Sequence, residues 1–420
     1  MNTAKEEKIH DDIENFSIQS RTVNRLINRR DGSVFHSKLK IFGDATLGTT
    51  PSAIFDQSWL RSGKLPDYWD TSQPSLLMAD LFCGLGGMSL GVVEAGKALG
   101  INVVPKMALD FDKDSLSTYK LNFDSAACYQ TDIATIIDGE IGDMLTESEK
   151  KLKSEIGNID LVIGGPPCQG NSDLNNHTRR KDPKNQLLLK VVRFAEVFSP
   201  QNVIIENVQG VRHDKEKVTV QAIEHLNKLG YKTHEGLLMA SHFGVAQNRR
   251  RYFLVATKVK DFDFEGITKN YGKEERTFDW ACSDLYNEFS EKVFDTPAKH
   301  SKTNQDRIEY LFTHDLHELP DDQRPNCHKN GNHSYKSVYG RLHINKPAPT
   351  ITSGFGSIGQ GRFCHPIFKR SITPHEAARL QFMPDFFRFP ETIKRASLQK
   401  MIGNAVPSKL SYLVTLELLR

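Results

Sequence analysis

The chain has 420 residues, with 55 lysines and arginines against 52 aspartates and glutamates, a formal net charge of +3 and a pI near 8.4. This length allows two domains with full cores, and the mild positive charge permits a polyanionic partner without requiring one. No apolar run reaches membrane-spanning length, the polar N-terminus does not resemble a signal peptide, and the 6 cysteines show no CxxC pair or disulfide spacing. A membrane or secreted protein is therefore excluded, and a reducing, cytoplasmic location is expected.

Residues 1–74 contain two polar segments that predict short helices, Glu6 to Phe16 and Arg21 to Arg30, with Ser20 capping the second. The second segment is rich in arginine, so a DNA-binding helix-turn-helix is one interpretation. The favoured interpretation is an accessory extension that packs on the rest of the chain or clamps DNA. The arginines in question are Arg21, Arg25, Arg29 and Arg30.

A glycine-rich turn follows the first strongly apolar stretch. An apolar strand leads into Asp80, the turn contains Gly84, Gly86 and Gly87, and a helix is predicted over Met88 to Leu99. Glycines between a strand and a helix let the backbone approach a ligand closely, with the N–H groups of the helix facing it. Because NAD-dependent dehydrogenases use the same arrangement, this turn alone indicates a nucleotide-like ligand and no more.

The next two predicted elements each end in an acidic residue. The strand Val103 to Asp110 places its carboxylate roughly 20 residues after the glycine turn, where it can bind ribose hydroxyls. A third element ends near Asp132, which can accept a hydrogen bond from an adenine amine, and Phe111 and Ile133 can sandwich the ring. The alternative is that both acids only cap helices.

The segment Gly164 to Ser172, GGPPCQGNS, holds the first candidate for catalysis. The apolar run Ile159 to Ile163 before it is typical of a buried parallel strand, so the motif lies at a strand end, where open α/β sheets place their chemistry. Two prolines hold the backbone extended and present Cys168 as a candidate nucleophile. Taken alone, a buried structural cysteine is the commoner interpretation.

The remaining elements complete the predicted order. A buried strand, Asn202 to Ile205, precedes Glu206, and the polar stretch Gln169 to Gln186 predicts a mobile loop. Residues 261–371 are turn-rich, without a strong helical period. Thr373 caps a helix that opens with Pro374, and the last helix, Ser408 to Leu419, is predicted to pack back on the first domain. A zinc site is not expected, because the spacing of the following residues matches no standard finger: Cys327, His328, His333, Cys364 and His365.

Six motifs in a fixed order resemble the DNA (cytosine-5)-methyltransferases of bacterial restriction–modification systems, over about residues 75–420. They are DLFCGLGG (Asp80–Gly87), GGPPCQGNS (Gly164–Ser172), ENV (Glu206–Val208), QNRRRYF (Gln247–Phe253), RLHINKPAPTIT (Arg341–Thr352) and GNAVP (Gly403–Pro407). The resemblance implies an α/β, Rossmann-like sheet that uses S-adenosylmethionine, with a second, smaller target-recognition domain. The domains it implies are an accessory extension (1–74), a catalytic and cofactor-binding domain (75–260), the target-recognition domain (261–371) and a C-terminal return to the catalytic domain (372–420).

The resemblance also implies a mechanism and its residues. Cys168 attacks carbon-6 of a flipped cytosine in duplex DNA, Glu206 protonates ring N3, and Arg251 binds O2. Arg249 orients the pocket, and Gln247 of the same motif joins the catalytic set. The implied cofactor-binding residues are Asp80, Phe82, Gly84, Gly86, Gly87, Asp110, Phe111, Asp132, Ile133, Pro166, Asn404 and Ala405. No metal is implied.

The chain departs from the family pattern at three positions, and three other functions remain as alternatives. Cys83, Pro166 and Asp110 replace residues more frequent in the family. An RNA methyltransferase like the tRNA-aspartate enzymes would carry a Cys-Phe-Thr stretch, and an amino-group methyltransferase would carry Asp, Asn or Ser before the prolines. The third rival is a non-catalytic DNA-binding module, which the complete catalytic set disfavours.

The implied setting is a monomer on double-stranded DNA in a bacterial cytoplasm, associated with the nucleoid and without a membrane. Whether a restriction endonuclease or other defence-system proteins partner it stays open, as does the recognised sequence.

Overall fold

The computed structural model describes residues 13–41, 50–64, 72–124, 126–167, 186–214, 216–259, 262–287, 290–329 and 338–420. Cys168 and nearly all of the predicted mobile loop after it lie outside these residues, as does most of the first predicted N-terminal helix.

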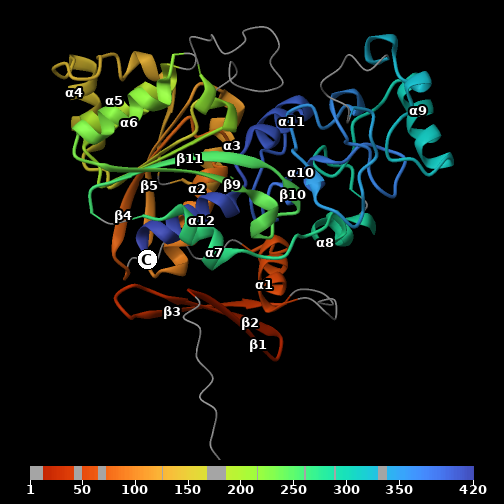
Figure 1. Cartoon of the computed structure of the whole chain (residues 1–420), viewed down its shortest axis with the longest axis horizontal. Coiled ribbons are helices and arrows are strands. Elements are labelled where there is room, and N and C mark those ends of the chain that lie inside the picture. The colour runs from red at the N-terminus through yellow and green to blue at the C-terminus, as the bar shows by residue number, and fades with distance from the viewer. Residues whose placement is uncertain are drawn as a thin grey trace, which may run out of the picture.

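A seven-stranded sheet forms the centre of the molecule, in the order β6-β5-β4-β7-β8-β11-β9 (Figure 1). Its strands are β4 (Ser75–Leu81), β5 (Asn102–Asp110), β6 (Ala127–Gln130), β7 (Leu161–Gly164), β8 (Asn202–Asn207), β9 (Lys232–Met239) and β11 (Arg250–Thr257). The first five in this spatial order run parallel, and β11 is antiparallel to both β8 and β9. The chain builds outward from β4 in both directions, so β4 lies at a topological switch point, where such sheets bind ligands. The predicted α/β, Rossmann-like class is confirmed.

Helices cover both faces of this sheet because its central strands are buried on both sides. Along β7, Leu161 and Ile163 enter one core while Val162 enters the other. One face is covered by α2 (Gly87–Ala98), α3 (Lys113–Asn122), α7 (Phe264–Tyr271) and α12 (Ser408–Leu419). The other is covered by α4 (Glu147–Ile156), α5 (Leu187–Phe198) and α6 (Val218–Lys228).

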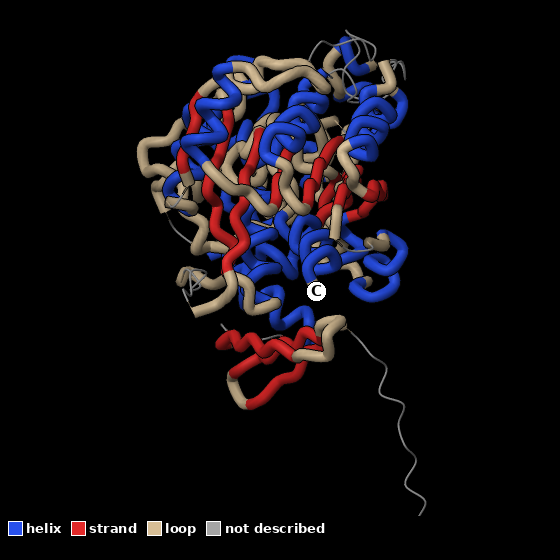
Figure 2. Tube along the Cα trace, turned by 90° about the vertical axis from the view of Figure 1, so that its left-hand side faces the viewer, coloured by secondary structure: helices blue, strands red, loops and turns tan. Residues whose placement is uncertain are grey.

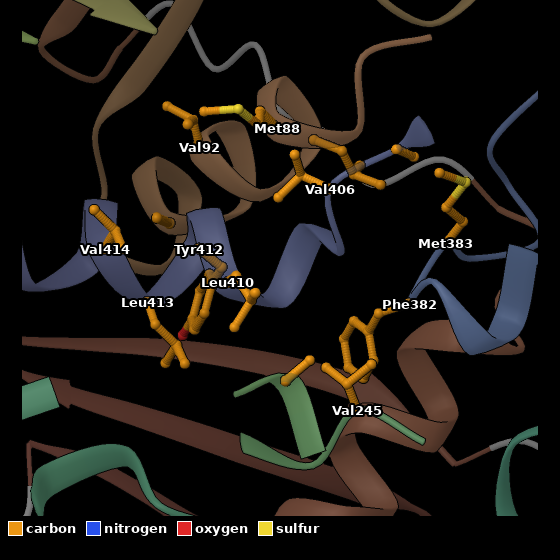
Figure 3. Close-up of a cluster of buried hydrophobic side chains, with 14 of the residues drawn as sticks. Met88, Val92, Val245, Phe382, Met383, Val406, Leu410, Tyr412, Leu413 and Val414 are labelled. Atoms are coloured by element: carbon orange, nitrogen blue, oxygen red, sulfur yellow. The ribbon is translucent and has the colours of Figure 1, made fainter. Parts of the chain in front are cut away.

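The C-terminal segment returns to the catalytic sheet through three helices, α10 (Pro374–Leu380), α11 (Arg395–Asn404) and α12. The predicted cap of α10 is confirmed, since Thr373 precedes Pro374 as the N-cap and forms a capping box with Glu376 in the first turn. Helix α12 packs along α2, and Figure 3 shows Met88 and Val92 of α2 in the same buried cluster as Leu410 and Leu413 of α12. The segment with the glycine turn and the segment with the GNAVP motif are thereby brought together.

The described part of the N-terminal extension forms an antiparallel sheet, so the helix predicted over Arg21 to Arg30 is wrong, as is the end of the helix predicted over Glu6 to Phe16. The sheet consists of β1 (Glu14–Gln19), β2 (Thr22–Asn28) and β3 (Val34–Lys40), and it lies with α1 (Pro51–Leu60) below the main body (Figure 2). In β2 every second residue is buried, which is the period of a strand rather than of a helix. Ser20 does not cap a helix but lies in the β1–β2 hairpin turn with a φ of 58°. Because the arginine-rich segment is a strand, the helix-turn-helix interpretation is wrong.

The region predicted to be turn-rich contains more helix than its pattern indicated. Besides α7 it holds α8 (Phe278–Cys282) and α9 (Lys302–Thr313), and the short strand β12 (Ala348–Pro349) pairs in parallel with β10 (Gln247–Asn248). Only Ile308 and Leu311 of α9 are fully buried, so the buried face of this helix is narrow. They belong to a small separate core. Helix α7 contacts β9 and α12, so the chain still packs on the catalytic sheet after residue 260. The domain boundaries stay predictions. Within the described residues, no helix has the length and apolar character needed to span a bilayer.

Candidate active site

The predicted catalytic motifs meet at one edge of the sheet because parallel strands end there together. Leu81 at the end of β4 pairs with Gly164 of β7, which in turn pairs with Ile205 of β8. Strand β11 runs the opposite way, so its first residues start at the edge where β8 ends, and Glu206 pairs with Phe253. The loops that follow β4, β5, β7 and β8 are therefore neighbours in space.

Glu206 is a buried carboxyl with an arginine partner at this edge. Its side chain is 9% exposed, and Arg251 Nε lies 2.8 Å from its Oε1. Burial raises the pKa of Glu206 above its ordinary value, although the charges of Arg251 and Arg249 oppose the shift. A carboxyl of this kind holds a proton more readily than a free one and can act as a general acid.

The Gly165-Pro166-Pro167 segment lies directly against Glu206. A Cβ built on Gly165 would be 3.5 Å from Glu206 Oε2 and 3.8 Å from the sulfur of Met88. Asn207 Nδ2 donates to the carbonyl of Pro166 at 3.4 Å, which ties this segment to the end of β8. Cys168 follows Pro167 immediately but lies outside the described residues, so its distance to Glu206 is not assigned.

Arg249 and Gln247 face the protein interior. Arg249 donates to the carbonyls of Ile351 at 2.6 Å and Gly403 at 3.1 Å. Gln247 accepts from the Ile351 N–H at 2.8 Å and donates to the Leu380 carbonyl at 2.8 Å. Both side chains thus join β10 and the residue that connects it to β11 to the segment after β12 and to the C-terminal helices. These contacts suit the orienting role predicted for Arg249, and a direct catalytic role for Gln247 stays a prediction.

The glycine turn has the backbone geometry that its sequence predicts. Gly84 and Gly86 have φ values of +54° and +98°, and a Cβ on Gly86 would lie 2.5 Å from the Phe123 ring, so only glycine fits there. Phe82, just before them, also has a positive φ of 59°. Strained backbone of this kind outside glycine is concentrated at ligand sites.

Asp110 braces this turn from the neighbouring strand. Its Oδ2 accepts from the Gly84 N–H at 2.8 Å and its Oδ1 from the Asp112 N–H at 2.8 Å. Burial raises the pKa of Asp110, against these two hydrogen bonds. Each oxygen of an ionised carboxylate can accept a second hydrogen bond, so room for ribose hydroxyls remains. The next residue, Phe111, is 73% exposed and offers an open aromatic face.

Asp132 is exposed, whereas Ile133 is buried. Asp132 accepts from the Ala134 N–H at 2.9 Å and caps the 3-10 helix Ile133–Thr135, so the capping alternative describes its present contact. Of the two side chains predicted to sandwich the ring, Ile133 is 1% exposed and Phe111 is 73% exposed. Their contacts with an adenine stay predictions.

Asp80 lies beneath the glycine turn rather than in it. Its carboxyl accepts from the Ser89 hydroxyl of α2 at 2.6 Å. Burial raises the pKa of Asp80 to about 8. The contact ties β4 to α2, and a direct cofactor contact by Asp80 stays a prediction.

The GNAVP motif packs on the glycine turn. A Cβ on Gly87 would lie 2.8 Å from the Val406 carbonyl oxygen and 3.5 Å from the Ala405 Cβ. Asn404 ends α11 with an exposed side chain beside this contact. Residues more than 300 positions apart thereby form one surface at the carboxyl edge.

A profile of C-5 cytosine-specific DNA methylases matches residues 76–420. The chain is also 47% identical over 411 residues to the Type II methyltransferase M1.BsuMI of Bacillus subtilis (strain 168), covering 98% of this chain and 96% of that protein. The chain belongs to the C-5 cytosine-specific DNA methylase family.

More distant relatives agree with this methyltransferase family. The Type II methyltransferase M.DdeI of Desulfomicrobium norvegicum is 28% identical over 377 residues, covering 79% of this chain and 86% of that protein. A crystal structure of a putative DNA modification methyltransferase encoded within a prophage of E. coli superposes with a TM-score of 0.56 at 25% identity, covering 82% of this chain and 98% of that one. The family resemblance, the enzyme class and the fold predicted from the sequence are confirmed.

The methyltransferase site also contains residues to which the sequence assigned no role. Met88 and Asn207 contact the Gly165–Pro167 segment, and Lys400 of α11 lies 5.7 Å from the centre of the Phe111 ring while pairing with Asp112 at 2.5 Å. Asn207 lies within the ENV motif and could have been included. Lys400 could not, because its partner is 288 positions away.

The cysteine and histidine residues near the C-terminal part have local partners. His365 is fully buried, and its Nδ1 accepts from the N–H groups of Ile367 and Phe368 at 3.0 Å. In the described parts of the chain no group of 3 or more metal-ligating side chains gathers. The side chains of Cys327 and His333 are not among those described.

Proposed function

We propose that this methyltransferase transfers a methyl group to carbon-5 of a flipped cytosine in duplex DNA through a covalent adduct with Cys168. The observation that carries the proposal is the Glu206–Arg251 pair, which lies against the segment leading into Cys168. A proton-holding carboxyl and a fixed cation, beside the segment that leads into a cysteine, match the needs of attack on a pyrimidine ring.

Each residue has one task in this mechanism. The Cys168 thiolate forms a bond to carbon-6, and the electrons of the carbon-5 to carbon-6 double bond move into the ring toward N3. Glu206 donates its proton to N3, and Arg251 binds O2 as charge develops. Protonation of N3 leaves an enamine, and its electron pair at carbon-5 would form the bond to the methyl carbon as the bond between that carbon and the donor sulfur breaks. A base then removes the carbon-5 proton, the carbon-5 to carbon-6 double bond re-forms, the thiolate is expelled, and N3 returns its proton to Glu206.

The cofactor we propose is S-adenosylmethionine, which supplies the methyl group as an electrophile. The described residues fit its adenosine part: Phe111 leaves a ring face open, and Asp110 has acceptor capacity beside it. A Cβ on Gly84 would meet no atom within 4 Å, so the backbone at this point of the turn is open to a ligand. Asn404 and Ala405 close the same surface from the GNAVP motif.

The biological role we propose is protection of host DNA in a restriction–modification system or a related defence system. Support comes from relatives named as Type II methyltransferases, above all the one at 47% identity. The enzyme would act as a monomer on nucleoid DNA in the cytoplasm, with residues 261–371 reading the sequence and a restriction endonuclease as its counterpart.

Base-resolution mapping of 5-methylcytosine tests this function. DNA from cells that express the wild-type chain should carry 5-methylcytosine in one sequence context, and DNA from cells that express Cys168→Ala should carry none there. The variant should still bind the cofactor, because Cys168 is not assigned to that site. Methylation by Cys168→Ala at the wild-type level would contradict the mechanism, and absence of 5-methylcytosine with folded wild-type protein would contradict the function.

A further inference from the structure

One buried arginine joins the N-terminal sheet to two helices of the catalytic part. Arg25 of β2 is 3% exposed; its Nη2 donates to Glu94 of α2 at 2.9 Å and its Nη1 to the Tyr412 hydroxyl of α12 at 3.2 Å. The Tyr412 hydroxyl donates in turn to Glu14 of β1 at 2.6 Å. Figure 3 shows Tyr412 extending from α12 toward the N-terminal strands. A single guanidinium therefore bridges three parts of the molecule.

The two bridged helices are the ones whose N-terminal ends form the proposed cofactor surface. Helix α2 begins at Gly87 in the glycine turn, and α12 begins directly after the GNAVP motif. Their backbones are in close contact, since a Cβ on Gly91 would lie 2.0 Å from the Ser408 carbonyl oxygen. The Ser411 hydroxyl also donates to the Met88 carbonyl at 3.0 Å. Any change in the α2–α12 spacing is therefore transmitted to Gly87 and Ala405.

A second buried pair holds α12 from the same side. Lys409 donates to Asp56 of α1 at 2.8 Å, and both side chains are almost fully buried. The guanidinium of Arg25 lies over the Phe55 ring, 4.7 Å from its centre, which leaves it little freedom to move. Directional contacts to buried charges fix the relative position of helices more strictly than apolar packing does, and a lost partner is strongly felt.

We propose that Arg25 and Tyr412 are positioning residues for cofactor binding. By holding α2 and α12 at a fixed spacing, they keep the glycine turn and the GNAVP motif in register around the cofactor. The N-terminal extension thus acts on the methyl-donor side of the reaction and not on DNA recognition. This inference rests on the proposed use of S-adenosylmethionine.

The test compares two matched tyrosine substitutions in the full chain. Tyr412→Phe removes the hydroxyl that connects Arg25 with Glu14 and leaves the ring in place. Tyr271→Phe is the control, because the Tyr271 hydroxyl is also buried and also donates to a glutamate, Glu417, but on the last turn of α12. Calorimetric titration with S-adenosylmethionine, well below the melting temperature of each variant, measures the Kd.

We expect Tyr412→Phe to raise the cofactor Kd by about three- to tenfold, the factor that one ordinary hydrogen bond corresponds to. Tyr271→Phe should leave the cofactor Kd within about twofold of the wild-type value, even if its melting temperature falls as far as that of Tyr412→Phe. In turnover assays Tyr412→Phe should raise the KM for the cofactor while kcat and the KM for DNA stay unchanged. A loss of stability alone would not produce this separation.

A double-mutant cycle gives an independent measure. Arg25→Gln and Glu94→Gln should each weaken cofactor binding, and the double variant should lose less than the sum of the two. If Arg25→Gln does not fold, the tyrosine pair decides. Equal Kd values for wild type, Tyr412→Phe and Tyr271→Phe would overturn the positioning role alone. Failure of the wild type itself to bind S-adenosylmethionine would instead overturn the proposed cofactor, and this inference with it.

Discussion

The carboxyl edge of the central sheet and the N-terminal sheet each bury a glutamate, and the two glutamates are held in opposite states. At the edge, Glu206 has one close cationic partner, Arg251, and burial raises its pKa. Under the N-terminal sheet, burial would also raise the pKa of Glu14, but the charges of Lys409, Lys273 and Arg25 and the Tyr412 hydroxyl hold it below its ordinary value. The first carboxyl can hold a proton to donate, whereas the second stays ionised.

The difference follows from the number and geometry of partners. Three cations and a hydroxyl surround Glu14, so ionisation is stabilised from several sides and the group serves to fix geometry. Glu206 stands at the rim of the sheet, where a substrate could supply the missing partner. Burial alone therefore does not indicate a catalytic acid. A buried carboxyl with few groups to stabilise its ionised form is the better candidate.

The largest expected effect comes from Glu206→Gln, which keeps the shape of the side chain and removes the proton. Methyl transfer should fall by roughly a hundred- to ten-thousandfold, the contribution of a general acid. Because the acid works in its protonated form, the wild-type rate attributable to it should decline as the pH rises through the raised pKa of Glu206, and the variant should lack this decline. The measurement is the pH profile of single-turnover methylation.

A matched control is Glu235→Gln on β9, whose carboxylate accepts from Tyr252 at 3.4 Å and lies away from the Gly165–Pro167 segment. It should methylate at close to the wild-type rate. A change of less than about threefold in Glu206→Gln, far below the effect of a general acid, would show that Glu206 is structural.

Gly91→Ala tests how closely α2 and α12 must approach. The added Cβ would meet the backbone at Ser408, so the helices must separate, and we expect a loss of about 1–3 kcal/mol in the free energy of unfolding, with weaker cofactor binding. Denaturant unfolding and calorimetry measure the two effects. Gly63→Ala is the control, because a Cβ there has no neighbour within 4 Å. Equal stability of the two variants would mean that the helices are not tightly joined.

The smallest expected effect belongs to Asp110→Ala. Loss of the carboxylate should weaken cofactor binding by about 1–2 kcal/mol, as for a hydrogen-bonded charged group. The methylated sequence should not change, since Asp110 is assigned to the cofactor and not to DNA. Asp31→Ala, in the exposed β2–β3 turn, serves as the control for cofactor affinity. An altered methylation site in Asp110→Ala would contradict the division of tasks between the two parts of the chain.

The same contrast explains what the sequence could predict. The strands ending at Asp110, Gly164 and Glu206 are apolar runs followed by ordered motifs, so both their structure and their meeting point follow from local pattern. The segment of β2 is predicted as a helix from its sequence because Arg25 occupies an inward position of the strand and breaks the apolar alternation. An arginine there is tolerated only with Glu94 as partner, 69 positions away, and no local rule reveals it.

Contacts between segments far apart in the chain also could not be predicted from the sequence. Gln247 and Arg249 were recognised from their motif, but their bonds to Ile351, Leu380 and Gly403 depend on how the C-terminal helices return. Helix α9 escaped prediction because only two of its side chains are fully buried. Tertiary packing decides such elements, and a single sequence carries little of it.

The most direct test of the account is trapping of the covalent intermediate. Duplex DNA with 5-fluorocytosine at the methylated position is incubated with the enzyme and S-adenosylmethionine, and the denatured product is analysed by peptide mass spectrometry. Because fluorine cannot leave carbon-5 as the proton does, the account predicts a stable adduct on Cys168 in the wild type and none in Cys168→Ala. An adduct on another residue, or none from a preparation that methylates ordinary DNA, would contradict it.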